Sequence, residues 1–227
     1  MKHKNYTKGF ILKKNFYKDT SVFLEIFTLK FWKRTFFIKN FKKSKKINSA
    51  FLNIWSEIEI NFSERWDIRN IVEVSFIDGF ENLDEEGLTY LSYFLWLAWK
   101  FLHENEESDK TGLDIYLFFK KFFLVFKNFS EKEFIINEKK IFDEKNFLLL
   151  KIFFEVNFFT KLWYLKNLEN NFLKFLQNNN LKNILNTKIS ETDSFKVFHI
   201  FDTFLLENNC DKIIKIFDKK NFFNKNI

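Results

Sequence analysis

Apolar and polar positions alternate along the first eighty residues with the two-residue period of β-strands. The alternation is clearest late in this region, where Ile58 and Ile60 contrast with Glu57, Glu59 and Asn61. β-Branched and aromatic residues dominate the same region, as is typical of strands. The predicted strands cover residues 9–14, 21–32, 33–41, 51–62 and 68–77. Five short strands with few long connections favour a small closed barrel.

After the segment DGFENLDEEG, residues 78–87, the period of the apolar positions changes. Leu88, Leu91, Leu95, Ala98 and Leu102 recur at the spacing of one helix face. A helix start is indicated at Thr192 or Asp193, before another apolar-periodic run. The predicted helices cover residues 88–102, 112–129, 145–166, 168–177, 192–207 and 210–219.

These two patterns predict an α+β chain with two domains. Residues 1–80 are expected to form a five-stranded OB-fold β-barrel, a fold that commonly binds single-stranded nucleic acid. Residues 81–227 are expected to form an all-α carboxy-terminal domain. The change of period near residues 80–87 sets the expected boundary.

Composition narrows the class of protein. The chain contains 36 Phe, 4 Gly and no Pro, so phenylalanine must supply much of the core packing. The lone cysteine, Cys210, excludes a disulfide framework and a cysteine-based zinc module. No apolar run reaches the ~18 residues typical of a membrane span, and the amino terminus does not read as a signal peptide. We therefore expect a cytoplasmic protein without membrane association and without a cofactor.

Charge is distributed unevenly along the chain. The formal net charge is +7. Residues 1–50 carry 14 basic and 2 acidic side chains, a net of +12, whereas residues 51–110 carry 4 basic and 14 acidic side chains, a net of −10. A polyanionic partner would therefore be attracted to the first fifty residues.

The basic residues of that region are the candidate site. The segment KNFKKSKK, residues 39–46, lies between two apolar runs, so we expect a loop held at both ends. Lysines presented by barrel strands can contact successive phosphates, and aromatic rings among them can stack on bases. Alternation places Phe36 and Phe37 on opposite faces, and Phe41 is expected to be exposed. The candidate DNA-binding residues are Lys13, Lys33, Arg34, Lys39, Phe41, Lys42, Lys43, Lys45 and Lys46.

An alternative interpretation is that codon bias alone made this surface rich in lysine. The scarcity of arginine argues against base-specific recognition, because lysine is a point charge and cannot make the paired hydrogen bonds of an arginine.

No catalytic constellation is evident. The three histidines are isolated in the sequence, and no glycine-rich phosphate loop is present. We therefore expect a protein that is not an enzyme.

The order of these motifs resembles the RecO family of bacterial recombination mediators. The residues that carry the resemblance are KGFILKK, Asp19-Thr20, VFLEIFT ending at Phe27-Thr28, the basic KNFKKSKK, and NSAFLNIWSEIEINF. In the helical half, LTYLSYFLWLAWKFL and the pair Phe154-Glu155 are similar to family helices. Two departures concern turns, because the family usually has glycine where this chain has Phe31-Trp32 and Asn40. Asparagine tolerates left-handed conformations better than most residues.

The resemblance implies a mediator of DNA repair and recombination. Such a protein binds single-stranded and double-stranded DNA, anneals complementary strands, displaces single-strand-binding protein, and loads RecA together with RecR. It also implies a pocket in the helical domain for the acidic carboxy-terminal tail of single-strand-binding protein. Lysines that could pair with that tail are Lys120, Lys121, Lys151 and Lys161. The alternative from another class is a structural RNA-binding subunit of a ribonucleoprotein, such as a ribosomal protein of an AT-rich genome.

Overall fold

The computed structural model describes residues 5–18, 20–41, 47–65, 68–80, 83, 85–102, 110–131 and 144–162. These residues divide between two compact units, Met1–Lys127 and Asn128–Ile227. The first unit holds all the strands, α1 and most of α2, and the second unit holds α3. The predicted domain boundary near residue 80 falls between the last strand and α1, and as a domain boundary it stays a prediction.

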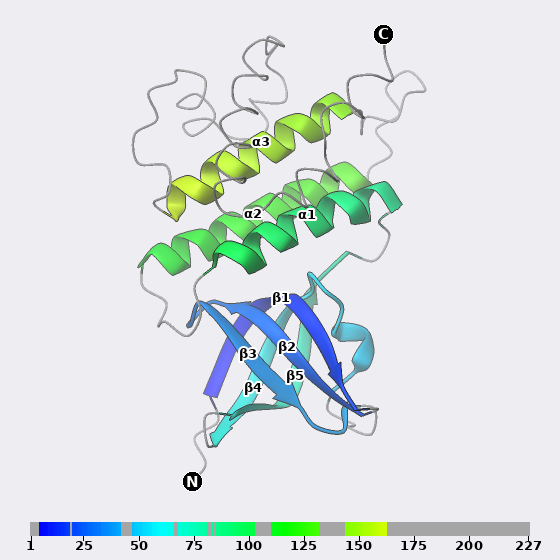
Figure 1. The fold of residues 1–227 in the computed structure, drawn as a ribbon, viewed down its shortest axis with the longest axis vertical. Helices are drawn as coiled ribbons and strands as arrows, with labels where there is room; N and C mark the ends of the chain where they lie inside the picture. The colour runs from blue at the N-terminus through cyan, green and yellow to red at the C-terminus, as the bar shows by residue number, and fades with distance from the viewer. Residues whose placement is uncertain are drawn as a thin grey trace. The chain divides into compact units, whose positions relative to one another are not determined.

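Five strands close into a barrel, as the sequence predicts. They are β1 (Asn5–Tyr17), β2 (Ser21–Thr28), β3 (Lys33–Ile38), β4 (Glu57–Arg65) and β5 (Ile68–Asp78). The order around the barrel is β1-β2-β3-β5-β4, with every pairing antiparallel except that of β3 and β5 (Figure 1). The parallel β3–β5 pairing has a single pair of facing residues, Phe37 and Asn70.

Strand β1 is long and pairs with both of its neighbours in the barrel, β4 and β2. Its first half pairs with β4 and its second half pairs with β2. The register with β2 shifts between Ile11 and Lys13, so one residue is inserted at this point. A β-bulge of this kind bends a strand and changes which face the following side chains point to. Ile11 therefore points into the barrel core, whereas Lys13 faces outward beside Glu25.

Strand β1 extends beyond the predicted range 9–14 at both ends. Strands β2, β3 and β4 also end or begin at other residues than expected, each for a local reason. Strand β2 stops at Thr28, whose hydroxyl donates to the Phe31 carbonyl across a tight turn. Strand β3 stops at Ile38, because Asn40 has a left-handed φ of 52°. Strand β4 begins only at Glu57, because Ser49–Phe51 forms the short 3-10 helix η2 and Trp55 adopts a φ of 74°.

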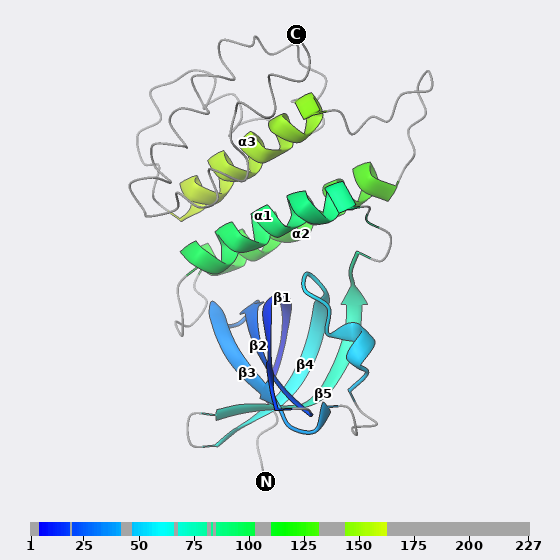
Figure 2. The ribbon, with the colours of Figure 1, turned by 45° about the vertical axis from the view of Figure 1, so that its right-hand side comes forward.

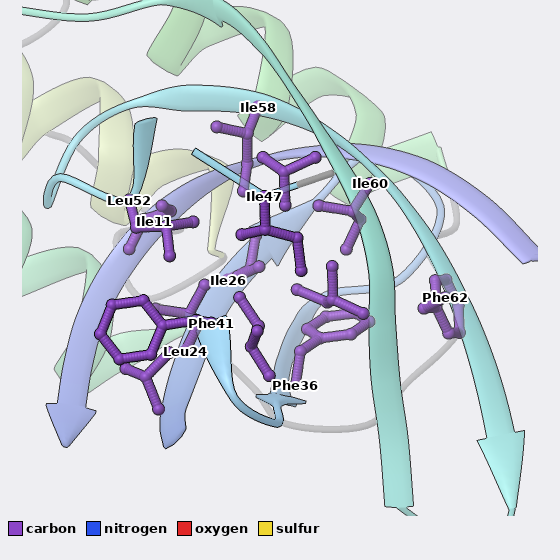
Figure 3. Close-up of a cluster of buried hydrophobic side chains, with 14 residues drawn as sticks. Ile11, Leu24, Ile26, Phe36, Phe41, Ile47, Leu52, Ile58, Ile60 and Phe62 are labelled. Carbon is purple, nitrogen blue, oxygen red and sulfur yellow. The ribbon is translucent and has the colours of Figure 1, made fainter. Parts of the chain in front are cut away.

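The barrel interior is filled by aliphatic and aromatic side chains from all five strands and from the β3–β4 connection. Figure 3 shows these side chains converging between the strands. Isoleucine and phenylalanine predominate, as the composition suggests. The cluster consists of Ile11, Val22, Leu24, Ile26, Phe36, Ile38, Phe41, Ile47, Leu52, Ile58, Ile60, Phe62, Ile71 and Val74.

Helices α1 (Glu85–Phe101) and α2 (Lys110–Glu131) lie side by side across one end of the barrel (Figures 1 and 2). Their inner face is aromatic. Phe10 of β1 packs against Tyr116 and Phe123 of α2, with ring centroids 5.2 and 5.5 Å apart. A helix is confirmed in the region predicted as 88–102, although it begins three residues earlier, at Glu85. A helix is also confirmed in the region predicted as 112–129.

A buried carboxylate joins the barrel to α2. Glu57, at the start of β4, is 3% exposed. It accepts hydrogen bonds from the Tyr116 hydroxyl at 2.7 Å and from the Lys120 ammonium at 3.0 Å. Burial and the bond to Glu57 raise the pKa of Tyr116 far above its usual value. Lys120 is therefore engaged in the contact between the barrel and the helix.

The second unit contributes one described helix, α3 (Glu144–Lys161), which confirms a helix in the region predicted as 145–166. Lys151 and Glu155, one turn apart, are both buried and pair at 2.8 Å. Lys151 is thus engaged within its own helix. The predicted helices over 168–177, 192–207 and 210–219, and Cys210, lie outside the described residues. None of the described helices is long and apolar enough to cross a membrane.

Candidate nucleic-acid interface

The predicted lysine-rich loop is anchored in the barrel at both ends. Lys42, Lys43, Lys45 and Lys46 lie outside the described residues, but the residues on either side of them are described. Phe41 and Ile47 are 4% and 5% exposed, and both belong to the barrel core. The expectation of a segment held at both ends is confirmed, while the contacts of the four lysines with DNA stay a prediction.

The expectation that Phe41 is exposed is wrong. Strand alternation ends at Ile38, so it no longer decides where a residue beyond the strand points. The left-handed conformation of Asn40 turns the chain back, and the Phe41 amide donates to the Thr20 carbonyl at 2.7 Å. This turn carries the ring into the core. The tolerance of asparagine for such a conformation is what the comparison with the family's glycine led us to expect.

Lys33 is also poorly placed to meet a ligand directly. It is 6% exposed, and its ammonium donates to the Trp99 carbonyl of α1 at 2.6 Å. Arg34 is partly buried, with its guanidinium 4.1 Å from the centre of the Phe31 ring. Lys13 and Lys39 do reach solvent: the Lys13 side chain is 41% exposed, and Lys39 follows the end of β3 as an exposed residue.

The structure shows an aromatic group that the sequence reasoning did not single out. Tyr17 of β1, Phe23 of β2 and Phe37 of β3 lie next to one another on the outside of the barrel. The ring centroids of Phe23 and Phe37 are 4.8 Å apart, and those of Tyr17 and Phe23 are 5.6 Å apart. We call these three residues the outer aromatic face. Phe36 is fully buried, so the predicted opposite facing of Phe36 and Phe37 is confirmed.

Strand pairing explains how the three rings meet. Phe23 faces Phe37 directly across β2 and β3, and Asn15 faces Phe23 across β1 and β2. Tyr17 lies two residues beyond Asn15, on the same face of β1. The sequence offered one signal for Phe23: Glu25 lies two residues further along the strand, on the same face, and a charged side chain is expected to face outward. The outward position of Tyr17 could not be predicted from the sequence, because it depends on the bulge in β1.

Positive charge borders this face. The Lys18 ammonium lies 5.4 Å from the centre of the Tyr17 ring, and Lys18 turns the chain with a φ of 54°. Thr20, after this turn, donates to the Asn40 side chain at 3.0 Å. The β1–β2 turn is therefore tied to the point where the lysine-rich segment leaves the barrel. Lysines and aromatic rings are thereby brought to the same end of β1, β2 and β3.

A further exposed ring lies at the end of β1. Phe16 is 66% exposed, and its ring centroid is 6.1 Å from that of Phe41. The Lys14 ammonium lies 5.1 Å from the centre of the Phe16 ring, and partial burial lowers the pKa of Lys14. Phe16 is thus a second aromatic surface near the start of the lysine-rich segment.

The other side of the barrel is acidic. On β4, Glu59 accepts a hydrogen bond from Tyr6 at 2.8 Å and lies 3.7 Å from the Lys8 ammonium. Glu64 pairs with Arg69 at 3.0 Å, and Glu73 accepts from the Asn61 amide at 3.1 Å. These carboxylates lie on β4 and β5, not on the three strands that form the outer aromatic face.

Residues 1–80 match the family model described as Recombination protein O N terminal. By this match, residues 1–80 are a RecO amino-terminal domain. The matched region spans the whole barrel, from β1 to β5, and the resemblance inferred from the sequence motifs is confirmed for residues 1–80. No curated protein matches the chain. Within the described residues, no group of three or more His, Cys, Asp or Glu side chains is arranged to hold a metal ion.

Proposed function

We propose that this protein binds single-stranded DNA across the outer aromatic face of its barrel. The observation that supports this best is the meeting of three rings with an anchored lysine-rich segment at one end of the barrel. Bases stack on aromatic rings irrespective of sequence, at about 1–3 kcal/mol per base. Paired bases in a duplex do not offer their faces, so the rings favour unpaired DNA.

The lysines of residues 39–46, together with Lys13 and Lys18, would follow the phosphate backbone. Neutralisation of phosphates releases counterions, which makes affinity depend on salt. The outer aromatic face contains no arginine guanidinium that could form paired hydrogen bonds with a base, so little base specificity is expected. Strands bound in this way have their charge reduced, and two complementary strands can then approach each other and anneal.

A titration of labelled single-stranded oligonucleotide tests this proposal. If about five phosphates are contacted, the logarithm of affinity falls against the logarithm of salt concentration with a slope of about −3.5. Tyr17→Ala should weaken binding about tenfold, since one stacking contact is lost. Tyr6→Ala is the matched control, because Tyr6 also has a lysine near its ring, Lys30 at 5.5 Å, but lies beside acidic β4. A flat salt response, or equal losses for the two variants, would refute the proposed surface.

The match of residues 1–80 to the RecO amino-terminal family supports a proposal for the wider role. We propose that the chain acts without catalysing a chemical reaction: it anneals strands, displaces single-strand-binding protein, and helps RecR to load RecA. Annealing of complementary oligonucleotides by the purified chain distinguishes this role from that of a structural RNA-binding subunit, which would lack the activity in isolation. A binding assay with the acidic tail peptide of single-strand-binding protein tests the recruitment step, and absence of binding would contradict it.

A further inference from the structure

A carboxylate lies among cations where the barrel meets α1. Glu25 faces outward from β2, with a side chain that is 14% exposed. One carboxylate oxygen accepts a hydrogen bond from the Trp99 indole N–H at 2.5 Å. The other oxygen lies 3.7 Å from the Lys13 ammonium. The carboxylate of Glu25 is therefore held by one neutral donor and one cation.

The two lysines of this cluster converge on the same indole ring. Their ammonium groups lie 4.2 Å (Lys13) and 5.5 Å (Lys33) from the centre of the Trp99 ring. Lys33 also donates to the Trp99 carbonyl, which belongs to the last turn of α1. A cation at a helix carboxy terminus is favourable, because the last carbonyls have no intrahelical donors and carry partial negative charge. Lys33 thereby fixes the position of Trp99.

These donors form a site suited to an anion with several oxygens. The cluster adjoins the outer aromatic face, since Lys13, Glu25 and Thr35 are paired across β1, β2 and β3. The next outward positions are Asn15, Phe23 and Phe37. Neighbouring outward positions on a strand are about 6.8 Å apart. An extended single strand stacked on the outer aromatic face could therefore place a backbone phosphate at this cluster.

We propose that Lys13 and the Trp99 indole N–H form a phosphate subsite, which Glu25 occupies in the free protein and vacates when DNA binds. Lys33 is a positioning residue, acting through the Trp99 main chain. This inference rests on the proposed function. It adds that Glu25 weakens DNA binding, because its carboxylate competes with a backbone phosphate for Lys13. The Lys13 ammonium is open to such competition, because its side chain is 41% exposed and it lies 3.7 Å from the Glu25 carboxylate, beyond the usual length of a hydrogen bond.

Glu25→Gln tests the competition. The amide carbonyl can still accept from Trp99, so the barrel–helix contact is kept while the charge is removed. We expect Glu25→Gln to bind single-stranded oligonucleotide about five-fold more tightly than the unaltered chain, at low salt. The matched control is Glu59→Gln, which removes the same charge from a carboxylate that is also 3.7 Å from a lysine, Lys8. That control should change affinity by less than about two-fold.

A double-variant cycle locates the effect at Lys13. Lys13→Gln alone should weaken binding and reduce the salt slope by about 0.7, the contribution of one phosphate. In the Lys13→Gln background, the gain from Glu25→Gln should disappear, because there is no longer an ammonium group to release. The Lys13→Gln measurement keeps the test decisive if Glu25→Gln fails to fold: an unchanged affinity and slope would overturn the subsite.

The outcomes separate this inference from the proposed function. If the unaltered chain does not bind single-stranded DNA, the proposed function fails. If it binds, but Glu25→Gln and Glu59→Gln strengthen binding equally, the net charge alone is responsible and the subsite is refuted. A gain from Glu25→Gln that persists without Lys13 would also refute it.

Discussion

The hydrogen bond from Tyr116 to Glu57 leads to a quantitative prediction for stability. Glu57 is buried at the junction of β4 and α2, and the Tyr116 hydroxyl donates to it at 2.7 Å. A hydrogen bond to a charged group contributes about 1.5–3 kcal/mol, and a carboxylate left short of a donor in a buried site loses most of that. Tyr116→Phe removes the donor and preserves the ring that packs on Phe10 and Phe27. We expect a loss of about 2 kcal/mol in the free energy of unfolding.

The Lys120 contact should contribute less. Its ammonium is also 3.0 Å from Glu57, but its side chain is 52% exposed, so water screens the pair. Lys120→Met should therefore cost no more than about 1 kcal/mol. Tyr6→Phe is the matched control for Tyr116→Phe, because Tyr6 donates to Glu59 at 2.8 Å from an exposed position. Its unfolding midpoint should match that of the unaltered chain.

Urea unfolding followed by circular dichroism measures all three variants. With a urea dependence of about 2 kcal/mol per molar, Tyr116→Phe lowers the midpoint by roughly 1 M. The reasoning depends on burial rather than on hydrogen-bond length, since the Tyr6 and Tyr116 bonds are nearly equal in length. Equal midpoint shifts for Tyr6→Phe and Tyr116→Phe would refute it.

Three further predictions concern pH and packing. Burial and the bond to the Glu57 carboxylate raise the pKa of Tyr116. The stability that this shift contributes is present below the ordinary tyrosine pKa of ~10 and is lost as pH rises above it. The free energy of unfolding of Tyr116→Phe should therefore fall less steeply with pH in the alkaline range. Partial burial acts to raise the pKa of Asp78, but hydrogen bonds from Lys127 and the Gly79 amide lower it overall. The stability that Asp78 contributes is therefore present above pH ~3.9 and is lost as pH falls. In Lys127→Met, the free energy of unfolding should depend less on pH in the acid range. Gly9→Ala would place a methyl group 2.7 Å from a main-chain carbonyl of β2, and overpacking of this kind should lower the free energy of unfolding by about 1–3 kcal/mol in a urea titration.

The sequence predicted the barrel because strand alternation depends on local side-chain type. The same rule predicted that Phe36 and Phe37 face opposite ways, without deciding which of them is buried. The expectation of a lysine-rich loop held at both ends came from the apolar runs on either side of it. The exposure of Phe41 was predicted wrongly, because the rule was applied beyond the end of β3. The turn at Asn40, not the strand period, decides where Phe41 points.

Other features depend on contacts between residues far apart in the chain. The bulge in β1 is visible only once β1 and β2 are aligned, and it decides that Lys13 and Tyr17 share a face. The burial of Lys33 depends on α1, more than sixty residues away, because the Trp99 ring lies over its ammonium and the Trp99 carbonyl accepts a hydrogen bond from it. No local pattern distinguishes such a lysine from its exposed neighbours, which is why Lys33 was placed among the DNA-binding residues.

The short seam between β3 and β5 has a consequence for motion. Phe37 and Asn70 are the single facing pair of that parallel pairing, so few main-chain bonds hold this side of the barrel shut. Local opening needs least free energy where few bonds must break. Amide protons at the seam should therefore exchange with solvent sooner than those between β1 and β2. Phe37 also belongs to the outer aromatic face. An oligonucleotide bound to that face would therefore hold β3 in place and slow the exchange of amide protons at the β3–β5 seam.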